Sequence, residues 1–462
     1  MSNLAPVEYV GAQSAGGPLL VIEGVQGVAW DEQVEVRLQT GEIRHGVVLE
    51  VDRNLAVVEV FEGTSGIEPR SATAAFAGRP LRIPVSEGWL GRTCNGRGEP
   101  IDGGPPVFGA TWSEVVGYPV NPSARTAPSA PIVTGISAID GLATLVRGQK
   151  LPIFSAAGLP HLELAAQIAA QARAEGGSFR VLFAAMGITH SDADLVRGVL
   201  EGRAATGDLA LFINTADDPV IERVLTPRIA LTVAEHLAFS LGQQVLVVMA
   251  DMTSYCEAVR EVAAARGEVP GRRGFPGYLY SDLASLYERC GRIRGRSGSI
   301  TQMPVLTMPA GDITHPVPDL TGYITEGQIV LTADLQAHGV YPPFDALSSL
   351  SRLMRRGAGT GHTREDHLAV AAQVYASLAR ARQVRETAEL VGEAALTETD
   401  RRYLAFDDAL ETDFLTQGRE EARSLTETLD RAWRLLAGLP RAELTMVDPR
   451  LVDSHLGEQV SQ

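Results

Sequence analysis

"LPIFSAAGLPHLELAAQIAAQA", residues 151–172, runs from a short apolar segment through a glycine-containing turn into a stretch with helical character. This order is typical of a phosphate-binding strand, loop and helix, whose turn reads G-x-x-x-x-G-K-[ST]. Ser155 and Pro160 stand at the two glycine positions of that template, with Gly158 between them. His161 stands at the lysine position and Leu162 at the hydroxyl position. The turn can still offer backbone N–H groups and a helix N-terminus to an anion, although an ordinary turn in a buried sheet explains it as well.

A second element of a phosphate site follows the apolar run "QQVLVVMA", residues 243–250. Asp251 ends this run, where many nucleotide-binding sheets hold a magnesium-linked carboxylate, although aspartate is also a common turn residue. The ends of parallel strands meet at one edge of a sheet, so we expect Asp251 to lie beside the turn around Ser155. No complete phosphate-binding motif can exist elsewhere, because Lys150 is the only lysine of the chain.

The amino-acid composition limits the classes of function that the chain can have. A chain of 462 residues with 45% hydrophobic residues can fill several domain cores. Its net charge of −16 argues against a nucleic-acid partner. The three cysteines and nine histidines show no disulfide framework and no metal-ligand spacing, so we expect no metal site. We expect no signal peptide and no transmembrane segment, because the longest apolar run, "VLVVMA", is too short to span a bilayer.

The periodicity changes twice along the chain and predicts a multidomain α/β protein. Alternating apolar and polar residues predict an N-terminal β-barrel over residues 1–75. Residues 76–355 begin with a Gly- and Pro-rich connection and continue as alternating strand and helix patterns. This alternation predicts a central, mainly parallel α/β domain. One of its helices is expected to begin at residue 227. Residues 356–462 carry helical apolar stripes and predict a C-terminal helical bundle, with Thr363 or Asp366 as a cap of its first helix.

Several longer blocks carry a family resemblance. "LGRTCNGRGEPIDGGPP", "SAAGLPHLE", "DMTSYCEAVREV" and "SLSRLMRRGAGTGHTREDH" occur in order, with further matching blocks between them, over about residues 18–370. Together they resemble the B subunits (beta chains) of V-type and archaeal-type rotary ATP synthases. The block around Ser155 distinguishes this non-catalytic subunit from its catalytic sister. The resemblance implies that the central domain is a P-loop NTPase (RecA-like) domain with a degenerate P-loop.

The resemblance also implies a function and partners. Three copies would alternate with three catalytic A subunits in a ring that couples ATP synthesis or hydrolysis to proton translocation. The ring would contact a central stalk, near the loop of residues 268–284, and a peripheral stalk. It would lie on the cytoplasmic side of the membrane as a peripheral part of the complex, with membrane contact only through the membrane sector. ATP or ADP would bind at the interface with the catalytic subunit, which would hold the magnesium ion.

Two positions acquire a specific meaning from the resemblance. Ile188 stands where catalytic relatives carry a glutamate that orients the attacking water. Arg352, in "SSLSRLM", would be an arginine finger that reaches the γ-phosphate in the neighbour's catalytic site. Without the resemblance, Arg352 is better interpreted as a surface arginine at a helix start.

The sequence also departs from the family, and two rival functions stay open. Leu162 replaces the usual asparagine, Ala157 a common serine and Phe344 an aliphatic residue. A self-sufficient hexameric NTPase motor, such as an RNA translocase or a secretion ATPase, would share the domain order but would need a complete P-loop in every copy. A pseudo-enzyme that binds another anion at the Ser155 turn is the second rival.

Overall fold

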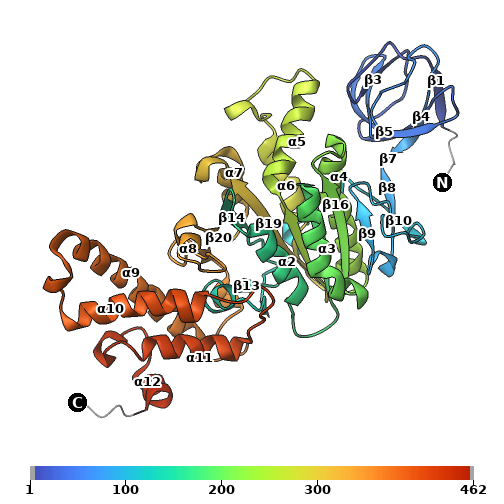
Figure 1. The fold of residues 1–462 in the computed structure, drawn as a ribbon. Helices are drawn as coiled ribbons and strands as arrows, with labels where there is room; N and C mark the ends of the chain where they lie inside the picture. The colour runs from blue at the N-terminus through green and yellow to red at the C-terminus, as the bar shows by residue number, and fades with distance from the viewer. Residues whose placement is uncertain (1–5, 458–462) are drawn as a thin grey trace.

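The computed structural model describes residues 6–457. Three units follow one another in an elongated molecule, with the β-barrel at one end, the α/β unit in the middle and the helical unit at the other end (Figure 1). The two chain ends therefore lie far apart. This order of units is the one that the sequence predicts.

Antiparallel strands form the N-terminal barrel. Alternating residues such as Leu20, Val34, Val58 and Phe76 fill its interior, because side chains of a strand point to opposite faces in turn. The strands run in the order β1-β7-β4-β5-β6-β3-β2. Their bounds are β1 (Val7–Val10), β2 (Ser14–Gly16), β3 (Leu19–Glu23), β4 (Glu32–Arg37), β5 (Ile43–Asp52), β6 (Leu55–Val60) and β7 (Thr73–Pro80). The domain boundary at residue 75 falls inside β7 and stays a prediction.

The connection after the barrel lies against the central unit and adds a strand to it. It contains β8 (Arg82–Val85), the short helical turn η1 (Glu87–Trp89), β9 (Thr93–Asn95) and β10 (Thr111–Glu114). β9 pairs with the edge of the central sheet, a strand that the Gly- and Pro-rich sequence did not indicate. The rest of the connection holds η2 (Pro122–Ala124), β11 (Arg125–Thr126) and β12 (Pro131–Ile132).

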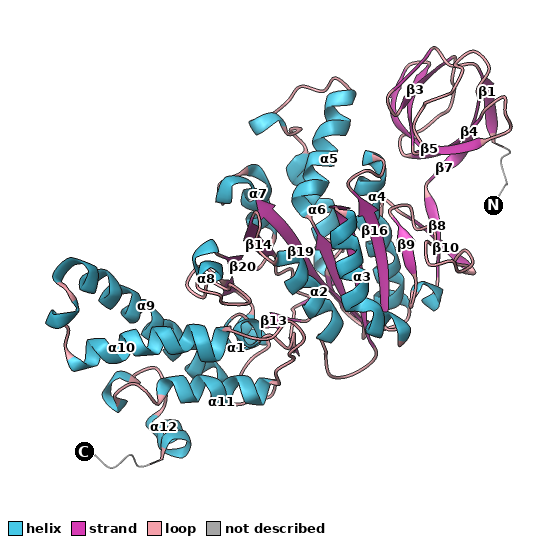
Figure 2. Ribbon diagram, in the orientation of Figure 1, coloured by secondary structure: helices cyan, strands magenta, loops and turns pink. Residues whose placement is uncertain are grey.

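The central sheet is mainly parallel, as expected, in the order β21-β20-β14-β19-β17-β15-β16-β9. Helices cover both faces (Figure 2). In β15 the side chains of Val181 and Phe183 face α2 and α3, and those of Leu182 and Met186 face α4 and α5. The strands of the sheet in this unit are β14 (Ile153–Ala156), β15 (Phe179–Ile188), β16 (Leu209–Thr215), β17 (Gln244–Ala250), β18 (Gly291–Ile293), β19 (Ser299–Met308), β20 (Gly327–Leu331) and β21 (Leu350–Ser351). The short strand β13 (Leu145–Val146) pairs with β12 in a separate two-stranded sheet.

One helix of this unit begins earlier than expected. The sequence predicts a helix from residue 227, but α4 (Val220–Glu235) contains Pro227 in its interior. Ile221 and Leu225 are buried on the first turns, and this apolar contact extends the helix past its proline. The other helices are α1 (Ser137–Leu142), α2 (His161–Gln171), α3 (His190–Ala205), α5 (Met252–Ala265), α6 (Leu279–Tyr287), α7 (Pro316–Ile324) and α8 (Ala333–Ala337), with the π-helical turn η3 (His236–Ser240) after α4 and the short turns η4 (Arg272–Gly274) and η5 (Pro309–Gly311).

The C-terminal unit is helical, and its predicted stripes form its core. Tyr403, Phe406 and Trp433 are buried, and Trp433 donates a hydrogen bond of 2.7 Å to Asp366. Asp366 precedes the first helix, but its side chain makes no capping bond there, because it accepts from Trp433 and Arg364 instead. The elements are η6 (Met354–Arg356), α9 (His367–Val391), η7 (Glu393–Ala395), α10 (Glu398–Ala409), η8 (Leu410–Leu415), α11 (Leu425–Leu436), η9 (Arg441–Glu443) and α12 (Pro449–Leu456).

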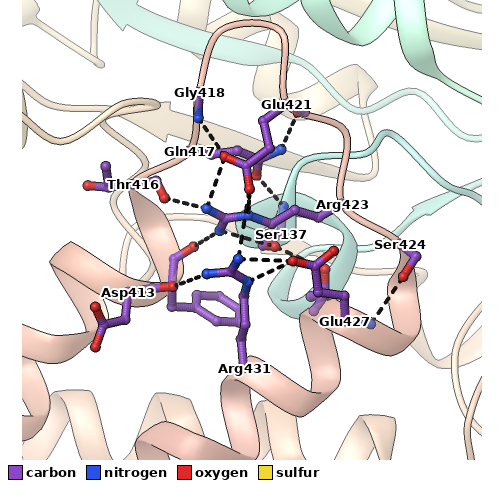
Figure 3. A network of polar contacts seen from close by, with 12 residues as sticks. Ser137, Asp413, Thr416, Gln417, Gly418, Glu421, Arg423, Ser424, Glu427 and Arg431 are labelled. Atoms are coloured by element: carbon purple, nitrogen blue, oxygen red, sulfur yellow. Dashed lines mark hydrogen bonds and ion pairs between the residues drawn. The ribbon is translucent and has the colours of Figure 1, made fainter.

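A polar network joins the central and helical units (Figure 3). Arg423 is buried and donates to the carbonyls of Phe414 at 2.8 Å and Thr416 at 2.6 Å. Gln417 donates to the carbonyl of Gly135 at 2.6 Å and so reaches across to the central unit. Gln167 of α2 binds the carbonyl of Gly418 at 2.9 Å. The helix that follows the candidate phosphate turn is therefore fixed to the helical unit.

Candidate functional site

The turn between β14 and α2, residues 155–162 and here called the β14–α2 turn, joins a strand to a helix, as a phosphate loop does. Gly158 lies at its exposed tip with φ of +83°, a conformation that favours glycine. Pro160 precedes α2 and makes no side-chain capping bond. The N–H groups of Leu162 and Glu163 meet no acceptor among residues 6–457. A helix N-terminus is thus available to an anion.

The polar side chains of this turn, those of Ser155 and His161, bond within the chain. Ser155 is buried, and its hydroxyl donates to the carbonyl of Ala156 at 2.9 Å. The ring of His161 has Nδ1 at 2.9 Å from the carbonyl oxygen of Leu159 and Nε2 at 3.5 Å from the hydroxyl of Thr307. His161 therefore takes the lysine position but is held against the end of β19.

Asp251 lies beside the turn, as the sequence predicts, because β14 and β17 both pair with β19. Its Oδ1 accepts from the N–H of Thr253 at 2.6 Å and from that of Thr307 at 3.3 Å, and its Oδ2 accepts from the Thr307 hydroxyl. Asp251 thereby caps α5. Both carboxylate oxygens are used within the chain, which is the geometry of a structural carboxylate. Thr307 is the member of this cluster that sequence reasoning missed.

Two further positions that the chemistry would need are apolar. Leu162 is 7% exposed and Ile188 is 6% exposed, and both belong to the core between the sheet and its helices. Neither can ligate a metal ion or orient a water molecule. The side chains that the structure describes include no cluster of three or more His, Cys, Asp or Glu arranged for a metal ion. The residues at this turn therefore do not fit magnesium.

Arg352 lies far from this turn in sequence and follows the edge strand β21. We call residues 350–356 the Arg352 segment. Arg352 is exposed. Its backbone N–H donates to the carbonyl of Glu326 at 3.1 Å, and Nη1 of its side chain donates to the carbonyl of Thr325 at 3.3 Å. Arg355 and Arg356 lie in a three-residue helical turn, so Arg352 precedes a short turn and no long helix begins there.

An ion pair formed by a buried lysine and two half-buried carboxylates supports the Arg352 segment. Lys150 is 3% exposed, and its ammonium lies 2.8 Å from Glu288 and 3.0 Å from Glu326. Burial lowers the pKa of Lys150, but the carboxylates of Glu326 and Glu288 outweigh burial and raise it. Gln149 binds the Glu326 carbonyl and the Ser351 hydroxyl, each at 3.0 Å. The only lysine of the chain thus fixes the residue whose carbonyl holds the backbone of Arg352.

Comparison with known proteins decides the family. The chain is 56% identical to the B subunit of the A-type ATP synthase of Aeropyrum pernix over 450 residues, which cover 97% of either chain. This chain belongs to the family of A-type ATP synthase B subunits.

Matches to known domains and to a solved structure divide this family member in the same way. The ATP synthase alpha/beta family's beta-barrel domain matches residues 13–75, and its nucleotide-binding domain matches residues 135–351. The C-terminal domain of V and A type ATP synthase matches residues 356–456. An ATP synthase subunit from Nanoarcheaum equitans has a similar structure, with a TM-score of 0.72 and 38% identity, over 92% of this chain and 100% of that one. Within residues 6–457, no helix has the length and apolar character to cross a bilayer.

Proposed function

We propose that this chain is the non-catalytic, regulatory subunit of a rotary ATP synthase. The observation that carries the proposal is that the polar side chains at the β14–α2 turn bond within the chain. His161 and Asp251 both bind Thr307, and Leu162 is buried where a metal ligand would stand. A chain that performed phosphoryl transfer alone would need a cation on the terminal phosphates and a free metal ligand at this turn. The same observation disfavours a self-sufficient hexameric motor.

The ring arrangement follows from the family. Three copies would alternate with three catalytic A subunits, around a central stalk and beside a peripheral stalk, on the cytoplasmic side of the membrane. The nucleotide would lie at the interface with the catalytic subunit, whose residues would hold magnesium. Proton translocation would be performed by the membrane sector of the complex. We also propose the domain limits 1–75, 76–355 and 356–462 for this chain.

Arg352 is the residue that we propose to act in the neighbour's catalytic site. Its guanidinium is exposed, while its backbone is held by Glu326. Phosphoryl transfer spreads negative charge over the equatorial oxygens, and a planar, permanently charged guanidinium matches this geometry better than an ammonium does. An arginine supplied in this way contributes roughly 10³ to 10⁵ in rate.

The test uses the ring assembled with its catalytic partner. We expect Arg352→Lys to leave the subunit ratio and size of the ring unchanged and to lower ATP turnover roughly 10³-fold or more. Arg355→Lys, three residues further in the same exposed segment, is the matched control and should change turnover little. An Arg352→Lys ring with turnover close to the parent would reject the finger. Failure of the chain to co-purify with a partner carrying a complete P-loop would reject the subunit assignment itself.

A further inference from the structure

A cavity of about 320 Å³ lies between the barrel and the central unit. Its barrel wall comes from residues 17–19 and 59–63, and its other wall comes from the start of α4 and the end of α5. The volume is at the lower end of the range for sites that bind small molecules. The cavity is separate from the β14–α2 turn and from the Arg352 segment, because it shares no lining residue with either.

A buried carboxylate without a partner lines this cavity. Glu59 lies in β6 and is 1% exposed, and its Oε2 has no hydrogen-bond partner among residues 6–457. Burying an unpaired carboxylate is costly, and burial raises the pKa of Glu59 to about 7. Arg266, which lines a neighbouring cavity, opposes this increase, and Glu261 adds to it. A ligand that brought a hydrogen-bond donor and a positive charge to Glu59 would remove this cost.

The remaining lining restricts the chemistry of such a ligand. Apolar side chains such as Phe61, Val220 and Val262 form most of the wall, and no lining residue is basic. Three further acidic residues, Glu62, Asp217 and Glu261, also line the cavity. Glu62 is already paired with His45 and Arg97, and Asp217 is paired with His190, whereas Glu261 is exposed and makes no ion pair with any residue in 6–457.

We propose that this cavity binds a small organic cation, an alkyl- or arylammonium ion, with its ammonium group at Glu59 and its apolar body between the barrel and α4. A bare metal ion does not fit, because no three acidic side chains in the described part of the chain are grouped to coordinate one, and metal ions need several oxygen ligands. The ligand would contact both units, so its binding would stabilise the folded chain by mass action. This site is independent of the function proposed above.

The experiment titrates the full chain calorimetrically with phenethylamine and, as the neutral control, with phenethyl alcohol at the same ionic strength. At pH 8 we expect the ammonium ion to bind at least tenfold more tightly than the alcohol. At pH 6 its affinity should fall about tenfold, because Glu59, with a pKa of about 7, is then mostly protonated. The alcohol should bind equally at both pH values.

Two variants localise the effect. Glu59→Gln should remove both the preference for the ammonium ion and its pH dependence, which separates Glu59 from His45, His190 and the carboxylates at the rim. Glu35→Gln, which removes an exposed carboxylate from strand β4 of the same barrel, should change neither.

Three results would overturn the proposal. They are the absence of saturable binding at pH 8, equal affinity for the ammonium ion and the alcohol, and full retention of the preference in Glu59→Gln. If Glu59→Gln does not fold, the comparison of the two probes at pH 8 and pH 6 on the parent chain still decides.

Discussion

The β14–α2 turn and the Arg352 segment differ in the direction of their polar groups. At the turn, Asp251 and His161 bind inward to Thr307, and Leu162 joins the core. At the Arg352 segment, the ion pair of the buried Lys150 lies below, and a charged side chain points to solvent above it. The polar side chains at the turn are thus hydrogen-bond partners within the chain. The Arg352 segment has the opposite arrangement, a backbone held by the carbonyl of Glu326 and an exposed guanidinium.

Removing the ion pair below Arg352 should have the largest effect on stability. We expect Lys150→Met to lower the free energy of unfolding by about 1.5–3 kcal/mol, because the half-buried carboxylates of Glu326 and Glu288 lose their charged hydrogen-bond partner. Chemical denaturation of the isolated chain measures this. In the ring, turnover should also fall, since the carbonyl of Glu326 positions Arg352.

Lys150→Arg is the control, because it keeps the charge. It should lower the free energy of unfolding by less than Lys150→Met does. Some destabilisation should remain, because the larger guanidinium must enter a space where the lysine side chain is only 4% exposed. A Lys150→Met chain as stable as the parent would show that the ion pair does not hold the segment.

Asp251 offers a smaller and more specific contrast. We expect Asp251→Ala to lower the free energy of unfolding by about 1–2 kcal/mol, because α5 loses its cap. Asp251→Asn should be nearly neutral, since asparagine caps as well as aspartate does. Thermal denaturation of the two variants separates a capping role of Asp251 from a metal-binding role, because a metal ligand would depend on the negative charge that asparagine lacks. Magnesium-dependent nucleotide binding by the parent that disappears in Asp251→Asn would contradict the structural role.

The sequence predicts the parts of this site that depend on local pattern. The turn at residues 155–162 follows from an apolar strand and a helical run, and the position of Asp251 follows from the rule that parallel strands end at one edge. The same rule could have indicated Thr307, because it lies near the end of β19. The strand pattern marks such an end only within a few residues, so the contact itself had to be seen.

Partners that are distant in sequence could not be predicted in this way. The ammonium of Lys150 pairs with Glu288, 138 residues away. The backbone N–H of Lys150 donates to the carboxylate of Glu326, 176 residues away. Nothing in the local sequence of Lys150 distinguishes it from a surface lysine. The early start of α4 has a similar cause, because burial of Ile221 and Leu225 against other parts of the fold outweighs the signal of Pro227.

A lysine at position 161 should have the smallest effect of these substitutions. The change in ATP affinity would measure how far the other residues of the turn limit nucleotide binding. The isolated parent chain should hydrolyse no ATP and bind it weakly, with little dependence on magnesium. In His161→Lys, a permanent positive charge stands at the first residue of α2, beside the free N–H groups of Leu162 and Glu163. ATP affinity should rise by a small factor, about two- to fivefold, which corresponds to a single exposed charge interaction of about 0.3–1 kcal/mol. Magnesium dependence and hydrolysis should not appear, because Leu162 remains buried and both oxygens of Asp251 remain bonded within the chain. Calorimetric titration with and without magnesium measures the affinity, and His161→Gln, which adds no charge, is the matched control. Measurable hydrolysis by isolated His161→Lys would mean that one substitution reopens the turn, and that the inward bonds of Asp251 yield to a metal ion.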